Sequence, residues 1–128
     1  DLGCGSGIDS ILAARRTGPS GRVIALDFLP EMLERTSAVA REAGLENIET
    51  LEGEMEGIPL PDSTIDCVIS NGVINLSPRK ARALAECARV LRPGGEFCVA
   101  DVFFFKETAT TETYTRSYAL PLHGALPL

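Results

Sequence analysis

The sequence opens with the glycine-rich stretch Asp1-Leu2-Gly3-Cys4-Gly5-Ser6-Gly7. An acidic residue, an apolar residue and three glycines at alternate positions are typical of a strand end that turns sharply into a helix. Glycine suits such a turn because it tolerates left-handed backbone and lets a ligand approach the main chain. We expect Ser6 to cap the following helix, whose free N–H groups then face a ligand held over the loop. The stretch predicts a nucleotide-type cofactor site at the carboxyl end of a strand, and we expect most of that strand to precede Asp1.

Short apolar runs alternate with amphipathic segments along the rest of the chain. The predicted strands cover residues 22–27, 48–53, 65–71 and 96–102, and the predicted helices begin after the glycine loop, at Pro30 and at Ser77-Pro78. Uninterrupted apolar runs suit strands that are buried on both faces, and glycine or proline follows each helix. This alternation predicts an α/β fold with a parallel sheet that is covered by helices on both faces.

Composition limits the classes of function. The chain has 128 residues and a net charge of −6, which indicates at most one domain and disfavours a nucleic-acid binder with a basic surface. We find no apolar run of membrane-spanning length and no signal-peptide pattern. The four cysteines (Cys4, Cys67, Cys87 and Cys98) form no CxxC pair, so we expect buried free thiols in a reducing cytoplasm rather than a metal site or disulfides. These features favour a cytoplasmic protein that binds neither nucleic acid nor a membrane, and they leave its oligomeric state open.

The pattern changes at residue 103. Residues 103–128 hold both tyrosines and the one histidine, and they sustain neither the period of a strand nor that of a helix. The run from Tyr114 to His123 resembles translated sequencing-adapter sequence. We therefore divide the chain into a partial cofactor-binding core, residues 1–102, and a tail, residues 103–128, that we expect to be non-native. A genuine substrate-lid segment is the alternative.

Two classes of cofactor domain place a glycine loop between the first strand and helix. Dinucleotide-binding domains need G-x-G-x-x-G, and Ile8 stands at its last position when the motif is counted from Gly3, which disfavours a nicotinamide-dependent oxidoreductase. Asp27 ends the next predicted strand, where a carboxylate can accept both ribose hydroxyls of an unphosphorylated adenosine. The observed D-x-G-x-G-x-G resembles motif I of class I S-adenosylmethionine-dependent methyltransferases. That resemblance implies S-adenosyl-L-methionine as the cofactor, with its methionine end along the glycine-rich backbone near Asp1.

Later stretches narrow the resemblance. Residues 53–62 resemble the G-D-A-E-x-L-P-F-P-D segment of the same superfamily, residues 69–78 read ISNGVINLSP, and residues 90–95 read VLRPGG. Together with LPEML at residues 29–33, they resemble the arsenite methyltransferase family over residues 1–102. The resemblance implies a Rossmann-like class I methyltransferase fold, which we expect to be truncated at both ends. It also implies transfer of a methyl group to a small soft acceptor such as arsenite.

The resemblance implies a set of cofactor-binding residues: Asp1, Gly3, Cys4, Gly5, Gly7, Asp27, Phe28, Glu54, Met55 and Asn71. In this set Glu54 lies near the adenine amino group and Met55 lines the ring. Asn71 ends a predicted strand and, by the resemblance, faces the transferable methyl group, so it is our candidate catalytic residue. An equally open alternative is that its side chain forms hydrogen bonds with backbone groups of the following loop. Residues 1–102 contain no Ser/His/Asp constellation, so we expect proximity, orientation and desolvation of the nucleophile to drive the transfer.

One position departs from the resemblance. Where the arsenite family typically has an arsenic-binding cysteine, this chain has Gly72. Several soft thiolates must converge on trivalent arsenic, and glycine supplies none. The predicted fold and cofactor do not depend on residue 72, whereas the identity of the methyl acceptor does. The alternatives are another small acceptor, such as a quinone precursor, and a fragment without activity.

Overall fold

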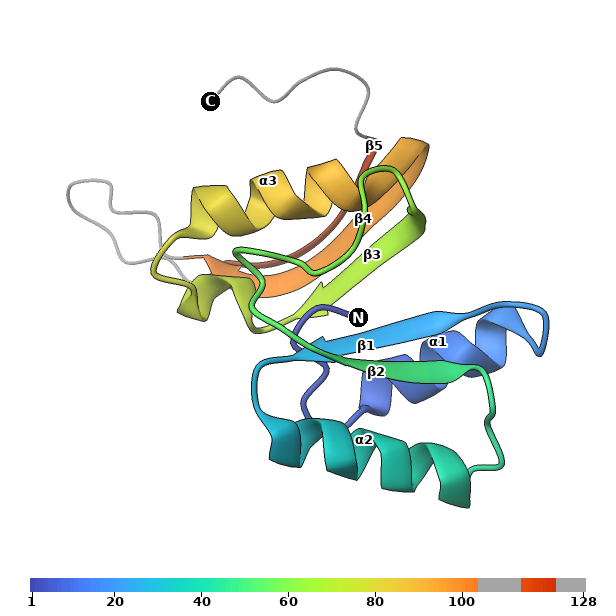
Figure 1. Ribbon diagram of the computed structural model, residues 1–128. Helices are drawn as coiled ribbons and strands as arrows, with labels where there is room; N and C mark the ends of the chain where they lie inside the picture. Colours follow the sequence, from blue (N-terminus) through green and yellow to red (C-terminus); the bar gives the residue numbers. More distant parts are fainter. Residues whose placement is uncertain (104–113, 122–128) are drawn as a thin grey trace. The chain divides into compact units, whose positions relative to one another are not determined.

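A computed structural model describes residues 1–103 and 114–121 of the chain (Figure 1). The chain divides into two compact units, residues 1–59 and 60–128, and each is described by itself. The elements in chain order are α1 (Ile8–Thr17), β1 (Val23–Asp27), α2 (Pro30–Glu42), β2 (Ile48–Glu52), β3 (Ile65–Asn71), the 3₁₀ helix η1 (Ile74–Leu76), α3 (Lys80–Val90), β4 (Leu91–Phe103) and β5 (Tyr114–Pro121). The predicted alternation of helices and strands is confirmed through β4.

The first unit is built on two parallel strands. β1 and β2 pair in register from Val23 opposite Ile48 to Asp27 opposite Glu52. The first residues of the chain run beside β1, because Leu2 forms a parallel bridge with Leu26 and the Cys4 N–H donates to the Leu26 carbonyl at 2.9 Å. The glycine loop therefore follows an extended segment that pairs with a parallel strand, as the motif predicts.

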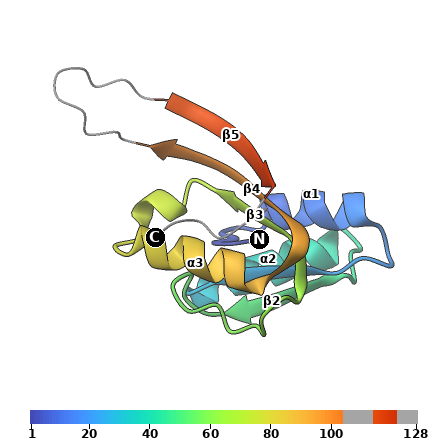
Figure 2. The same cartoon turned by 90° about the horizontal axis from the view of Figure 1, so that it is seen from above.

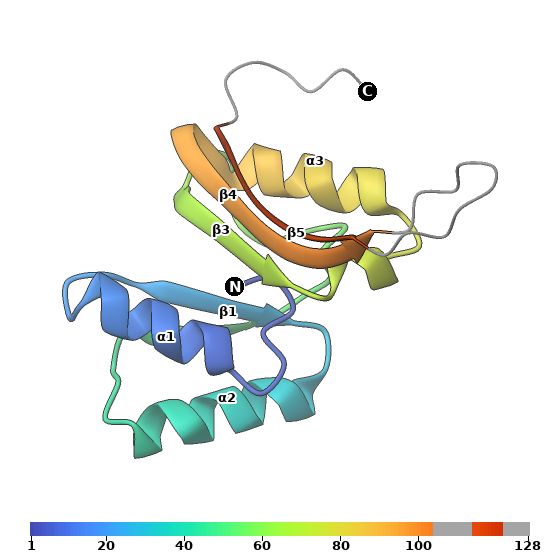
Figure 3. The same ribbon diagram turned by 180° about the vertical axis from the view of Figure 1, so that it is seen from behind.

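Both helices of the first unit turn an apolar stripe inward. On α2 the buried residues are Leu33, Thr36 and Ala40, a spacing of three and four that places them on one helical face. Leu33 packs into a core cluster with Cys4 and Ala25. α1 and α2 contact each other and the strand pair, and Figure 3 shows the two helices side by side. This cluster thus joins the glycine loop, β1 and α2.

The start of α1 differs from the prediction. Its N-cap is Gly7, at φ +88°, and no side chain makes a capping hydrogen bond. Ser6 is exposed. The predicted Ser6 cap is therefore wrong, because the chain enters the helix through a left-handed residue, a conformation that favours glycine over serine.

The second unit is a three-stranded sheet in the order β3-β4-β5, with β3 and β4 parallel. Alternate residues on these two strands are buried: Val68 and Ser70 on β3, and Phe97, Val99 and Asp101 on β4. Paired residues of neighbouring strands share a face, so these side chains form one buried face of the sheet. Ala83, Cys87 and Val90 of α3 are also buried.

Two boundaries in this unit differ from the prediction. α3 begins at Lys80 rather than at Ser77, because the Ser77 hydroxyl accepts the Arg79 N–H at 3.1 Å in a local turn. β4 begins at Leu91, although its register with β3 becomes regular only from Glu96, opposite Cys67. The predicted strand of residues 96–102 is the regular part of β4.

The tail contains one strand that its sequence pattern does not predict. β5 pairs antiparallel with β4, from Phe103 opposite Tyr114 to Glu96 opposite Pro121 (Figure 2). Residues 104–113 and 122–128 lie outside the described residues. The expectation that residues 103–128 are non-native concerns the origin of this segment, and it stays a prediction.

Candidate cofactor site

The glycine loop forms the centre of the candidate site. Gly3, Gly5 and Gly7 all adopt positive φ, at +69°, +53° and +88°, which confirms that the loop needs glycine at alternate positions. A Cβ built on Gly5 would meet no atom within 4 Å. The main chain at Gly5 is thus open to an approaching ligand, a feature that fits the methionine end of the predicted cofactor.

Asp27 lies at the end of β1 with 8% of its surface exposed. Its Oδ2 accepts the Gly5 N–H at 2.9 Å, and its Oδ1 accepts the Leu29 N–H at 3.1 Å. A carboxylate has about four acceptor positions, so both oxygens keep capacity for ribose hydroxyls. The sequence predicted the ligand role of Asp27, but it gave no sign of these two internal hydrogen bonds.

Asp1 is fixed from the other side of the loop. The Ser10 hydroxyl donates to Asp1 Oδ2 at 2.6 Å, and Ser10 is fully buried in α1. This hydrogen bond holds the Asp1 carboxylate against the first turn of the helix. Ser10 is a contributor to the site that the sequence pattern did not reveal.

The predicted adenine-binding residues lie at the same end of the first unit. Phe28 directly follows Asp27 and is 62% exposed. The Gly53 N–H donates to the Asp27 carbonyl at 3.0 Å, which brings the start of the next loop beside Asp27. Glu54 is exposed and Met55 half-buried in that loop. An exposed ring and an acidic loop beside Asp27 suit an adenosine.

The remaining predicted residue, Asn71, belongs to the second unit, where it is exposed at the end of β3. The next residue, Gly72, has φ +69° and donates its N–H to the Ala100 carbonyl at 2.7 Å. A Cβ at Gly72 would have no neighbour within 4 Å. The buried Asp101 accepts the Asn75 N–H at 3.0 Å, so two hydrogen bonds from β4 fix the loop after Asn71. The role of Asp101 was not predicted.

The cysteines differ in exposure. Cys4 and Cys87 are buried and Cys98 is half-buried, but Cys67 is exposed, so the prediction of buried thiols is wrong for Cys67. Cys67 and Cys98 share one face of the sheet, because Cys67 lies opposite Glu96 and Cys98 opposite Ile69. Burial raises the pKa of the Cys87 thiol to about 12, and burial also raises the pKa of Cys4. In the described part of the chain, no three His, Cys, Asp or Glu side chains gather as a metal site would require.

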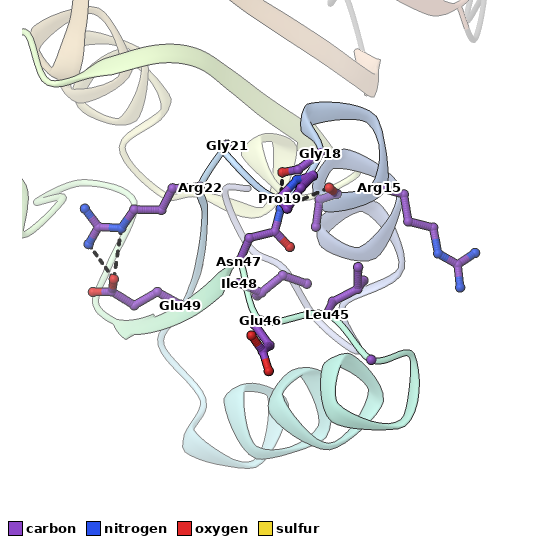
Figure 4. Close-up of a pocket in the computed structure, with 12 residues that line it drawn as sticks. Arg15, Gly18, Pro19, Gly21, Arg22, Leu45, Glu46, Asn47, Ile48 and Glu49 are labelled. Atoms are coloured by element: carbon purple, nitrogen blue, oxygen red, sulfur yellow. Dashed lines mark hydrogen bonds and ion pairs between the residues drawn. The ribbon is translucent and has the colours of Figure 1, made fainter.

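A pocket of about 730 Å³ lies elsewhere in the first unit, at the carboxyl end of α1 and the amino end of β2 (Figure 4). Several of its polar groups bind one another. Asn47 Nδ2 donates to the carbonyls of Ala14 and Gly18 at 3.0 and 2.9 Å, and Arg22 pairs with Glu49. Ligands of open α/β sheets bind at the carboxyl ends of strands, and the glycine loop and Asp27 lie at that end. We therefore take that end of β1, and not this pocket, as the candidate cofactor site.

The fold and the loop together define an α/β cofactor-binding domain. A family model described as a methyltransferase domain matches residues 1–123, and the chain belongs to this family. No helix among the described residues is long and apolar enough to cross a membrane.

Known relatives agree with that membership. An arsenite methyltransferase of Halobacterium salinarum is 43% identical over 80% of this chain and 26% of its own. A demethylmenaquinone methyltransferase of Listeria welshimeri is 38% identical over 79% of this chain and 43% of its own. The crystal structure of an arsenic(III) S-adenosylmethionine methyltransferase from Chlamydomonas reinhardtii superposes with a TM-score of 0.77 at 44% identity, over 85% of this chain and 40% of its own. The chain thus spans less than half the length of these three relatives.

Proposed function

We propose that this chain binds S-adenosyl-L-methionine and forms the cofactor half of a methyltransferase for a small soft acceptor. The observation that carries the proposal is the arrangement at the end of β1, where the buried Asp27 carboxylate meets a left-handed glycine loop. Bound S-adenosylmethionine supplies an electrophilic methyl group on a sulfonium centre. The protein itself supplies binding, orientation and exclusion of water.

Each residue of the first unit has a distinct task in this proposal. Asp27 accepts the ribose hydroxyls through the acceptor capacity that its two internal hydrogen bonds leave. The open backbone at Gly5 lies along the methionine part, near the Asp1 carboxylate that Ser10 orients. Phe28 and the loop at Glu54 and Met55 enclose the adenine. Gly3, Cys4 and Gly7 shape the loop, and Cys4 anchors it in the core.

Asn71 and Gly72 are assigned to the acceptor side. Asn71 orients the reacting groups from the end of β3, and the loop after it is held by Ala100 and Asp101. We propose arsenite as the acceptor, because relatives from Halobacterium salinarum and Chlamydomonas reinhardtii bear that activity in their names. A small carbon acceptor such as a quinone precursor is the alternative, supported by the Listeria demethylmenaquinone relative.

Gly72 provides the test of the acceptor. The left-handed backbone there costs a residue with a Cβ about 1–2 kcal/mol, but the space around it is open. Gly72→Cys adds a thiolate ligand, whereas Gly72→Ser adds a side chain of similar size under the same backbone strain. In a protein of the relatives' full length that carries this segment, we expect Gly72→Cys to raise arsenite methylation above the wild type and above Gly72→Ser. Affinity for S-adenosylhomocysteine should stay nearly equal in all three proteins.

If Gly72→Cys brings no gain in arsenite turnover in that longer protein, arsenite is rejected as the acceptor and only the cofactor assignment remains. We further propose a reducing, cytoplasmic setting, because an exposed thiol such as Cys67 persists in reduced form there.

A further inference from the structure

Thr36 is a polar residue at the centre of an otherwise apolar helix face. It lies between Leu33 and Ala40 on the buried side of α2, and its exposed fraction is 0%. A buried hydroxyl is costly unless it forms hydrogen bonds. Its partners therefore show what this position contributes.

Those partners all belong to the glycine loop. Thr36 Oγ1 donates to the Gly5 carbonyl at 3.0 Å and lies 3.6 Å from Cys4 Sγ. Gly7 packs directly on the same side chain, because a Cβ built on Gly7 would lie 2.8 Å from Thr36 Oγ1. One side chain of α2 thus contacts three residues of the loop that precedes α1.

The consequence is clearest at Gly5. Its N–H is held by Asp27 from β1, and its carbonyl is held by Thr36 from α2. Both peptide groups that flank the Gly5 Cα are therefore fixed, although glycine is the residue with the greatest backbone freedom. With one of these two hydrogen bonds lost, the loop would sample orientations that do not match a bound cofactor.

We propose that Thr36 is a positioning residue of the cofactor site, whose hydroxyl holds the glycine loop in its ligand-binding orientation through the Gly5 carbonyl. Thr36 acts through the loop and does not itself touch the cofactor. The inference rests on the proposed function in one respect, namely that the loop binds S-adenosylmethionine.

The test separates the hydroxyl from the bulk of the side chain. Thr36→Ser and Thr36→Ala both remove the methyl group but differ in the hydroxyl, and Thr36→Val replaces the hydroxyl by a methyl at nearly constant volume. Binding of S-adenosylhomocysteine to the full chain is measured by calorimetry. We expect Thr36→Ser to bind within about twofold of the wild type, and Thr36→Ala and Thr36→Val to bind about three- to tenfold more weakly than Thr36→Ser. Equal affinities of Thr36→Ser and Thr36→Ala would overturn the proposal.

A control variant distinguishes the positioning role of Thr36 from a general effect of lower stability. Asn47→Ala deletes hydrogen bonds to Ala14 and Gly18 at the other end of the first unit. We expect Asn47→Ala to lower the denaturant midpoint while leaving the affinity of the folded protein within about twofold, since it does not touch the loop. If Asn47→Ala weakens binding as much as Thr36→Ala does at the same loss of stability, the positioning role is refuted.

Hydrogen exchange of the ligand-free chain tests, without any cofactor, whether the Thr36 hydroxyl holds the glycine loop. The Gly5 and Gly7 amides should exchange faster in Thr36→Ala than in Thr36→Ser, because the loop loses its tether. Equal exchange in the two variants would overturn the proposal even if the wild type binds well. A wild type that does not bind S-adenosylhomocysteine would contradict the proposed function, and the exchange comparison would still test the tether.

Discussion

The Asp27 carboxylate accepts the Gly5 N–H at 2.9 Å, a hydrogen bond between residues 22 positions apart in sequence. It joins the end of β1 to the loop that precedes α1. The same side chain also accepts the Leu29 N–H, at the N-cap of α2. Asp27 therefore ties the glycine loop and the start of α2 to the carboxyl end of β1, and in the proposed function it also offers acceptors to a ribose.

Replacing Asp27 tests both roles. We expect Asp27→Ala to weaken binding of S-adenosylhomocysteine by about 1–3 kcal/mol, and to lower the free energy of unfolding by an amount on the same scale, because the partly buried N–H groups of Gly5 and Leu29 lose their acceptor. Asp27→Asn keeps one carbonyl acceptor and should fall between wild type and Asp27→Ala in both measurements. Calorimetry and urea unfolding provide the two values. Unchanged cofactor affinity in Asp27→Ala would remove Asp27 from the site.

Glycine substitutions should have graded effects. Gly7→Ala meets a positive φ and a Cβ contact of 2.8 Å with Thr36, whereas Gly5→Ala meets a positive φ in open space. Gly57 has neither restriction and is the control. We expect losses of unfolding free energy of roughly 3 kcal/mol or more for Gly7→Ala, about 1–2 kcal/mol for Gly5→Ala, and less than about 0.5 kcal/mol for Gly57→Ala. Gly7→Ala as stable as Gly57→Ala would contradict the loop geometry.

Arg89 connects α3 to the loop before β3. Its guanidinium donates to both oxygens of the buried Glu86 at 2.8 Å, to the Leu60 carbonyl at 2.8 Å and to Asp62 at 2.7 Å. Without Arg89, the buried Glu86 carboxylate loses a positive charge and hydrogen bonds that offset the cost of removing it from water. We expect Arg89→Met to lower the free energy of unfolding by about 1–3 kcal/mol.

The matched control for Arg89 is Arg92→Met. Arg92 pairs with Asp66 at 2.7 Å, but both side chains are largely exposed. Exposed ion pairs contribute about 1 kcal/mol or less. Urea unfolding should therefore show a clearly larger loss for Arg89→Met, and equal losses would argue against the network at Arg89.

The cysteines should react with iodoacetamide in order of exposure and thiolate content. The reactive species is the thiolate, and burial raises the pKa of Cys87 to about 12, so this thiol stays protonated at pH 8. We expect the exposed Cys67 to be alkylated well before Cys87, as resolved by peptide mass spectrometry. Rapid labelling of Cys87 in the folded chain would contradict its burial against the sheet of the second unit.

The same pKa gives a pH dependence of stability. A thiol whose folded pKa lies above its ordinary value of 9.0 stabilises the folded state fully below pH 9, and this contribution is lost as pH rises towards 12. Unfolding free energy should decline over that window. The decline should be smaller in Cys87→Ala, and an identical slope in the two proteins would argue against the shifted pKa.

The sequence predicted the elements better than the contacts between them. β1, β2 and β3 are found within one residue of their predicted bounds, because their apolar runs are flanked by glycine, proline or polar residues that mark the ends. α2 was recognised from its stripe, but that stripe did not distinguish Thr36 from Leu33. Which buried position contacts the glycine loop depends on how the helix packs, and periodicity carries no such information.

Other features depended on long-range partners. β5 has no recognisable alternation, and only its pairing with β4 defines it as a strand. The role of Asp101 depends on the Asn75 N–H, which a turn brings back towards β4. The Ser6 cap failed for a local reason, since the loop requires a left-handed residue immediately before α1. In the candidate site, the residues themselves were predicted, but the hydrogen bonds that hold them in place were not.

In the proposed function, the glycine loop and Asp27 bind S-adenosylmethionine rather than a dinucleotide. The most direct test is calorimetric titration of the wild-type chain with S-adenosylhomocysteine and, separately, with NAD. We expect saturable binding of S-adenosylhomocysteine that is weakened in Asp27→Ala, and no saturable binding of NAD. Binding of NAD with equal or higher affinity, or failure of the folded chain to bind S-adenosylhomocysteine, would contradict it.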